Sequence, residues 1–89
     1  MDEARHILVV EDDDELRGAV CETLQLAGYR AFGVASVSEA LESLRQHQAS
    51  LIISDVQLGD MNGHDFLKVA KQHWPEVPFV LITAYGTVE

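Results

Sequence analysis

The sequence predicts an α/β fold in which a parallel β-sheet is covered by helices on both faces. Three short apolar runs, rich in β-branched residues, predict inner strands at residues 7–10, 51–54 and 79–82. Runs of this kind, without polar alternation, are typical of strands that are buried on both faces. Helical segments separate the runs, and strands that alternate with helices indicate right-handed crossovers. A chain of 89 residues has room for one small domain.

The first predicted strand and helix occupy the N-terminal third of the chain. We expect a strand at about residues 6–11 and a helix at 14–27, with Asp13 as its N-cap and Gly28 as its C-terminal stop. The apolar stripe predicted to face the sheet consists of residues spaced by three or four: Leu16, Val20, Leu24 and Ala27.

The next two elements are a strand of a different kind and a second helix. Residues 29–34 alternate in side-chain size, which fits a strand at the edge of the sheet. Ser36 and Glu39 form a predicted capping box that opens the second helix. The residues of this helix expected to face inward are Ala40, Leu41 and Leu44.

The C-terminal half repeats the strand–helix–strand pattern. A strand at about residues 50–55 leads through a loop with Gly59 and Gly63 into a third helix. Pro75 ends this helix and Pro78 introduces the fourth strand. The apolar residues of the third helix are Phe66, Leu67, Ala70 and Trp74.

Polar side chains follow the apolar runs at the point where each strand ends. Glu11 and Asp12 follow the first run, and Asp55 and Thr83 follow the other two. In open α/β sheets, ligands bind at the carboxyl ends of the strands, so we expect these four side chains to converge. Clustered carboxylates are hard oxygen ligands that suit Mg²⁺ better than a soft metal.

Composition excludes several classes of protein. The net charge of −9, with six lysines and arginines, argues against contact with nucleic acid by these residues. The single cysteine, Cys21, cannot form an internal disulfide and favours a reducing compartment. There is no secretory segment and no apolar run that could span a bilayer. We therefore expect a soluble, cytoplasmic protein without membrane contact.

Three motifs resemble the receiver domain of two-component response regulators. They are VVEDD at residues 9–13, SDVQLGDMNG at 54–63 and TA at 83–84, and they occur in the order and with the spacing typical of that family. The ending TAYGTVE at 83–89 is similar to receivers of the NtrC-type transcription activators. The resemblance extends over the whole chain, and together the three motifs are specific.

The resemblance implies a fold, a reaction and a set of partners. The fold is a doubly wound, flavodoxin-like sheet of strand order 2-1-3-4-5, and Asp55 accepts a phosphoryl group from a sensor histidine kinase. Asp12, Asp55 and the backbone carbonyl of Gln57 would hold Mg²⁺, with Glu11 acting through an ordered water. Thr83 would donate its hydroxyl to a phosphoryl oxygen, next to the small side chain of Ala84. A domain of this kind signals and is not a turnover enzyme.

Two departures from the family pattern stand out. Gly59 occupies a position where the resemblance leads one to expect proline, so the loop after Asp55 should be looser. The sequence at 1–89 also stops after the fourth strand, without the fifth strand, its lysine or the output domain. We therefore expect a truncated receiver domain whose exposed strand at 79–82 allows self-association.

Two other functions compete with the phosphoacceptor. A degenerate receiver would act only as a protein-interaction module. A Mg²⁺-dependent phosphatase would also use Asp55 as its nucleophile, but it needs a second acid nearby, and Gln57 stands at the expected position. A calcium-binding EF-hand is excluded, because residues 12–15 lack the alternating ligands and central glycine of that loop.

Overall fold

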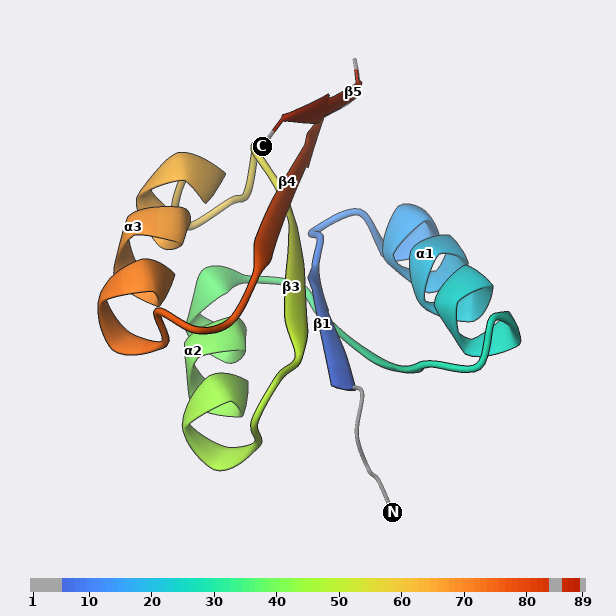
Figure 1. The fold of residues 1–89 in the computed structure, drawn as a ribbon. Coiled ribbons are helices and arrows are strands. Elements are labelled where there is room, and N and C mark those ends of the chain that lie inside the picture. The colour runs from blue at the N-terminus through green and yellow to red at the C-terminus, as the bar shows by residue number, and fades with distance from the viewer. Residues whose placement is uncertain (1–5, 84–85, 89) are drawn as a thin grey trace.

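The computed structural model describes residues 6–83 and 86–88 as one five-stranded sheet with helices on both sides (Figure 1). The strands are β1 (His6–Val10), β2 (Arg30–Val34), β3 (Leu51–Asp55), β4 (Phe79–Thr83) and β5 (Gly86–Val88). The helices are α1 (Asp14–Leu26), α2 (Val37–Gln46) and α3 (Gly63–His73). The strand order is β2-β1-β3-β4-β5, and the first four strands run parallel. The predicted doubly wound sheet is confirmed for these four strands, with β2 at an edge as its alternation indicated.

The main core lies between the sheet and helices α2 and α3. Figure 1 shows these two helices on one side of the sheet and α1 on the other. Phe66 of α3 is fully buried and packs its ring edge-on against Phe79 of β4, with 5.2 Å between ring centroids. The buried residues of this core are Leu8, Val10, Val37, Ala40, Leu44, Ile52, Phe66, Ala70 and Val77.

Each helix begins at a residue whose side chain caps its first turn. The side chain of Asp13 accepts a hydrogen bond from the Leu16 N–H at 3.0 Å, and Ser36 caps α2 through the N–H of Glu39 at 3.2 Å. Gly28, just beyond α1, has a φ of 99°, a conformation that glycine adopts without steric cost. These caps confirm the predicted start of two helices and the stop of the first.

The inward face of α1 differs from the predicted stripe. Leu16 is 50% exposed, Ala27 is also exposed, and no residue of α1 is fully buried. The half-buried residues are Arg17, Val20, Cys21 and Leu24, which follow the i, i+3, i+4, i+7 spacing of a helix face. The predicted stripe was wrong at its ends because Leu16 and Ala27 lie on the same flank of the helix, beside the half-buried face, and the spacing of apolar residues alone does not determine how the helix is turned on the sheet.

The outer edge of β4 also differs from the prediction. β5 pairs antiparallel with β4, joining Leu81 to Val88 and Ile82 to Thr87. The prediction that the strand at 79–82 has an unpaired outer edge was therefore wrong for its C-terminal half. A three-residue antiparallel strand satisfies those backbone groups locally, and it is distinct from the parallel fifth strand that the family resemblance implies.

Candidate functional site

Three carboxylates meet at the point where the order of the strands reverses. From β1 the chain passes to β2 on one side and then returns to β3 on the other, so the ends of β1 and β3 lie beside each other. Glu11 and Asp12 follow β1, and Asp55 is the last residue of β3. One carboxylate oxygen of each lies within 4.8 Å of the others. The structure therefore brings together three of the four side chains expected at the strand ends.

Glu11 is the buried member of this cluster. Its side chain is 7% exposed, while Asp12 is exposed and Asp55 half-buried. Its Oε2 accepts a hydrogen bond from the Asp13 N–H at 3.1 Å, and its own N–H donates to the Val34 carbonyl at 3.0 Å. Burial, and secondarily the charges of Asp55 and Asp12, raise the pKa of Glu11, although the Asp13 N–H opposes this shift.

Arg17 holds the loop that carries Glu11 and Asp12. Its guanidinium donates to the Glu11 carbonyl at 2.9 Å and to the Asp14 carboxylate at 2.6 Å. Gly33 makes room for this side chain, since a Cβ there would lie 2.8 Å from the Arg17 Cγ. The sequence analysis did not identify Arg17. The Asp14–Arg17 spacing of three on a helix was the available signal.

The backbone around Asp55 is tightly held. The buried hydroxyl of Ser54 donates to the Asp55 carbonyl at 2.9 Å. The next residue, Val56, donates its N–H to the Ile82 carbonyl at 3.0 Å and accepts from the Gly63 N–H at 2.7 Å. Gly63 is buried against this turn, because a Cβ there would meet the Asp55 carbonyl oxygen and the Val56 Cα. These contacts therefore fix the position of the Asp55 backbone at the end of β3.

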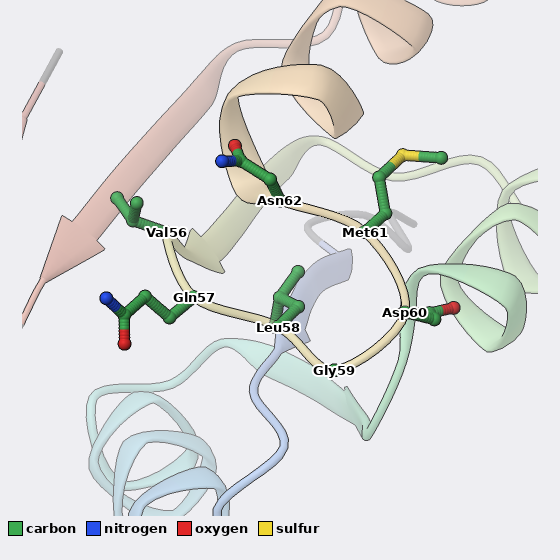
Figure 2. Close-up of a pocket in the computed structure, with 7 residues that line it drawn as sticks. All are labelled: Val56, Gln57, Leu58, Gly59, Asp60, Met61 and Asn62. Carbon is green, nitrogen blue, oxygen red and sulfur yellow. The ribbon is translucent and has the colours of Figure 1, made fainter.

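The remaining predicted site residues lie on two neighbouring segments. Thr83 ends β4 and follows Ile82, the residue paired with Asp55, so its backbone lies next to the strand end. Ala84 lies outside the described residues. Gln57 belongs to the loop at 56–62, which lines a shallow hollow of about 350 Å³ (Figure 2). The roles of Thr83 and Gln57 stay predictions.

The carboxylate cluster fits Mg²⁺ by its chemistry. The cluster provides only hard oxygen donors, from residues at two adjacent strand ends, which is the donor set that Mg²⁺ prefers. Three like charges with oxygens within 4.8 Å of one another repel, and a divalent cation would relieve that repulsion. Asp12 and Asp55, the more exposed pair, would hold the ion directly, while Glu11 lies deeper.

The raised pKa of Glu11 predicts how stability depends on pH without metal. Because the folded pKa lies above the ordinary value of 4.5, the carboxyl group contributes most to stability below that value. This contribution is lost as pH rises from 4.5 through the folded pKa. We therefore expect Glu11→Gln, which stays neutral, to be more stable than wild type at pH 7 in the presence of a chelator. Urea titrations across this pH range measure the difference.

The matched control for this prediction is Glu42→Gln. Glu42 is an exposed glutamate of α2 that pairs with Arg45 at 3.3 Å and does not belong to the cluster. Its substitution should change the stability by less than about 1 kcal/mol. A Glu11→Gln variant less stable than wild type at pH 7 would contradict the argument that a buried, ionised carboxylate at this position destabilises the fold.

Comparisons of this chain with known proteins all indicate the same family. The profile of the response regulator receiver domain matches residues 7–89. The response regulator protein FleR of Pseudomonas aeruginosa is 42% identical over 86 residues, which cover 97% of this chain and 18% of that protein. The C4-dicarboxylate transport transcriptional regulatory protein DctD of Rhizobium meliloti is 33% identical over 99% of this chain and 19% of its own length. The chain thus spans about a fifth of these relatives.

The same similarity holds in three dimensions. The response regulator protein TrrA of Thermotoga maritima, solved in complex with Mg²⁺ and BeF, superposes with a TM-score of 0.87 at 27% identity. The match covers 92% of this chain and 71% of the TrrA chain. Relatives named NtrX and NtrC also match, which agrees with the resemblance noted at residues 83–89. None of the helices in the described part of the chain has the length and hydrophobicity needed to cross a membrane.

Proposed function

The chain belongs to the response regulator receiver domain family, and we propose on that premise that it is the phosphoacceptor of a two-component signalling system. The single observation that carries the proposal is the meeting of Glu11, Asp12 and Asp55 at the switch point of the sheet. Asp55 is the proposed acceptor, because it ends the central strand and its backbone is held on both sides. The donor would be a phosphohistidine of a sensor kinase.

The proposed reaction is the transfer of one phosphoryl group to Asp55. A carboxylate oxygen of Asp55 attacks the phosphorus atom, and the bond from phosphorus to the leaving group breaks as the new P–O bond forms. The leaving group is the imidazole of the kinase, or acetate when acetyl phosphate is the donor. The rate then depends on how the reacting groups are positioned and how their charge is stabilised, because phosphoryl transfer requires little covalent chemistry from the protein.

Asp55 and the acidic residues around it are also proposed to hold Mg²⁺. Bound Mg²⁺ supplies positive charge to the phosphoryl oxygens, which would otherwise be repelled by the carboxylates. Asp12, Asp55 and the backbone carbonyl of Gln57 would be its direct protein ligands, and Glu11 would orient a bound water. Thr83 would donate its hydroxyl to a phosphoryl oxygen. The relatives' family and the donor set support this assignment.

The curated relatives indicate the proposed partners. The chain covers 18–19% of FleR and DctD. By analogy with these longer relatives, the proposed receiver would control an output region in the same regulator. DctD is named as a transcriptional regulator, and we propose a cytoplasmic regulator of transcription for this protein too. Phosphorylation of Asp55 would change the conformation that the output region contacts.

Labelling by a small phosphodonor tests the function. The wild-type chain is incubated with acetyl phosphate in millimolar Mg²⁺ or in excess EDTA, and intact mass is measured over time. We expect a single phosphoryl adduct that forms with Mg²⁺ and does not form with EDTA, because the carboxylates then repel the donor. Equal labelling in both samples would contradict the Mg²⁺ site. Mg²⁺ binding without any labelling would favour the interaction module instead.

A further inference from the structure

Asp60 connects the loop after Asp55 to the start of helix α2. One of its carboxylate oxygens accepts a hydrogen bond from the Val37 N–H at 3.1 Å. The other accepts from the N–H and from the hydroxyl of Ser38, each at 3.1 Å. Figure 2 shows the side chain of Asp60 directed towards the ribbon of α2. From its sequence context Asp60 would be assigned to an exposed loop, but these contacts join it to residues more than twenty positions earlier in the chain.

These contacts have a clear physical cause. Val37 and Ser38 are the first two residues of α2, and the first N–H groups of a helix have no acceptor within it. A carboxylate at that end also interacts favourably with the helix dipole. The hydrogen bonds, first that from Val37, lower the pKa of Asp60, so it stays ionised when the solution is mildly acidic.

Asp60 is the hydrogen-bonded anchor in the middle of the loop at 56–62. At the start of the loop, Val56 is bound to β4, and at its end the Gly63 N–H closes onto the Val56 carbonyl. Between these points stands Gly59, which is conformationally the most permissive residue of the loop. A Cβ on Gly59 would meet nothing within 4 Å, and the packing of this part of the loop comes from Leu58 and Met61, which are half-buried against the core. Between Leu58 and Met61, the contact of Asp60 with α2 adds a directional, hydrogen-bonded restraint to this packing.

We infer that Asp60 is a positioning residue for the Mg²⁺ site. By holding the loop against α2, it fixes the backbone of Gln57, which lies between the Val56 anchor and Asp60. The inference rests on the proposed function, in which the Gln57 carbonyl is a metal ligand. Asp60 does not belong to the carboxylate cluster and acts through the loop. A purely structural cap of α2 would affect the stability of the fold without affecting the metal.

A Mg²⁺ titration followed by backbone amide NMR separates the two roles. We expect Asp60→Ala to weaken Mg²⁺ binding roughly tenfold, the lower end of the effect of removing groups that orient metal ligands. Ser36→Ala removes the other cap of α2, and should lower the melting temperature while leaving Mg²⁺ affinity unchanged. Asp65→Ala removes one exposed negative charge elsewhere, and measures the general electrostatic effect on affinity.

Two further variants make the test specific to the loop. Asp60→Asn, which keeps one acceptor oxygen, should bind Mg²⁺ with an affinity between those of wild type and Asp60→Ala. Adding Gly59→Pro to Asp60→Ala stiffens the loop and should recover part of the lost affinity. Amide exchange within residues 56–62 should also be faster in Asp60→Ala than in Ser36→Ala.

The outcomes distinguish this inference from the proposed function. A wild-type chain that does not bind Mg²⁺ would overturn the metal site, and the positioning role with it. A wild-type chain that binds Mg²⁺, together with an Asp60→Ala variant of equal affinity, would overturn the positioning role alone. An equal loss of affinity in Asp60→Ala and Asp65→Ala would also overturn it, because charge alone would then account for the effect.

Discussion

Replacing Gly63 with alanine is expected to destabilise the fold by about 3 kcal/mol, the upper range for adding a methyl group to a packed site. The added Cβ would meet the Asp55 carbonyl oxygen, the Val56 Cα and, at 3.0 Å, the Leu81 Cδ2. The first two are backbone atoms that cannot move aside by changing a rotamer. The loop must therefore shift as a whole, and it carries Asp55 with it. Urea titration of the purified chain measures this loss.

Gly18→Ala is the matched control. Gly18 lies within α1, and a Cβ there would meet nothing within 4 Å. Alanine is the better helix former by roughly 1 kcal/mol, so this substitution should raise the stability. A Gly63→Ala variant as stable as wild type would show that the turn after Asp55 is looser than its contacts indicate.

The second large effect is a complete loss of phosphoryl labelling in Asp55→Asn. The amide of asparagine has nearly the shape of the carboxylate but lacks its nucleophilic, negatively charged oxygen, so it cannot form the acyl phosphate. The substitution also removes one of three mutually repelling carboxylates, so we expect the variant to fold and to melt no lower than wild type in EDTA. Intact mass after incubation with acetyl phosphate and Mg²⁺ measures the labelling.

Asp65→Asn is the control for the loss of a carboxylate. Asp65 is exposed in the first turn of α3 and lies ten residues further along the chain. This variant should be labelled at the wild-type rate, because Asp65 is not part of the cluster. Labelling of Asp55→Asn at the rate of Asp65→Asn would exclude Asp55 as the acceptor.

The parts of the fold that sequence could predict depend on local patterns. The apolar runs that become β1, β3 and β4 end where polarity changes, and parallel strands bring those ends to one edge of the sheet. That rule was enough to predict that Glu11, Asp12 and Asp55 converge. The caps at Asp13 and Ser36 follow equally local rules, because the side chain and its partner are three residues apart.

The features that sequence did not predict depend on contacts distant along the chain or on competing packing. Asp60 has an ordinary loop composition around it, and its hydrogen-bond partner Val37 lies 23 residues earlier. The exposure of Leu16 follows from how α1 lies on the sheet, which periodicity alone does not determine. The antiparallel pairing of β5 with β4 was not indicated by any pattern that we recognised in the sequence.

The position of the phosphoryl group on the chain tests the central claim most directly. The labelled wild-type chain is treated with borohydride, which reduces an aspartyl phosphate to homoserine, and its peptides are then sequenced by mass spectrometry. The account predicts that homoserine replaces Asp55 and no other aspartate, and only in samples that contained Mg²⁺. Homoserine at Asp12 or Asp60, with Asp55 unmodified, would contradict it.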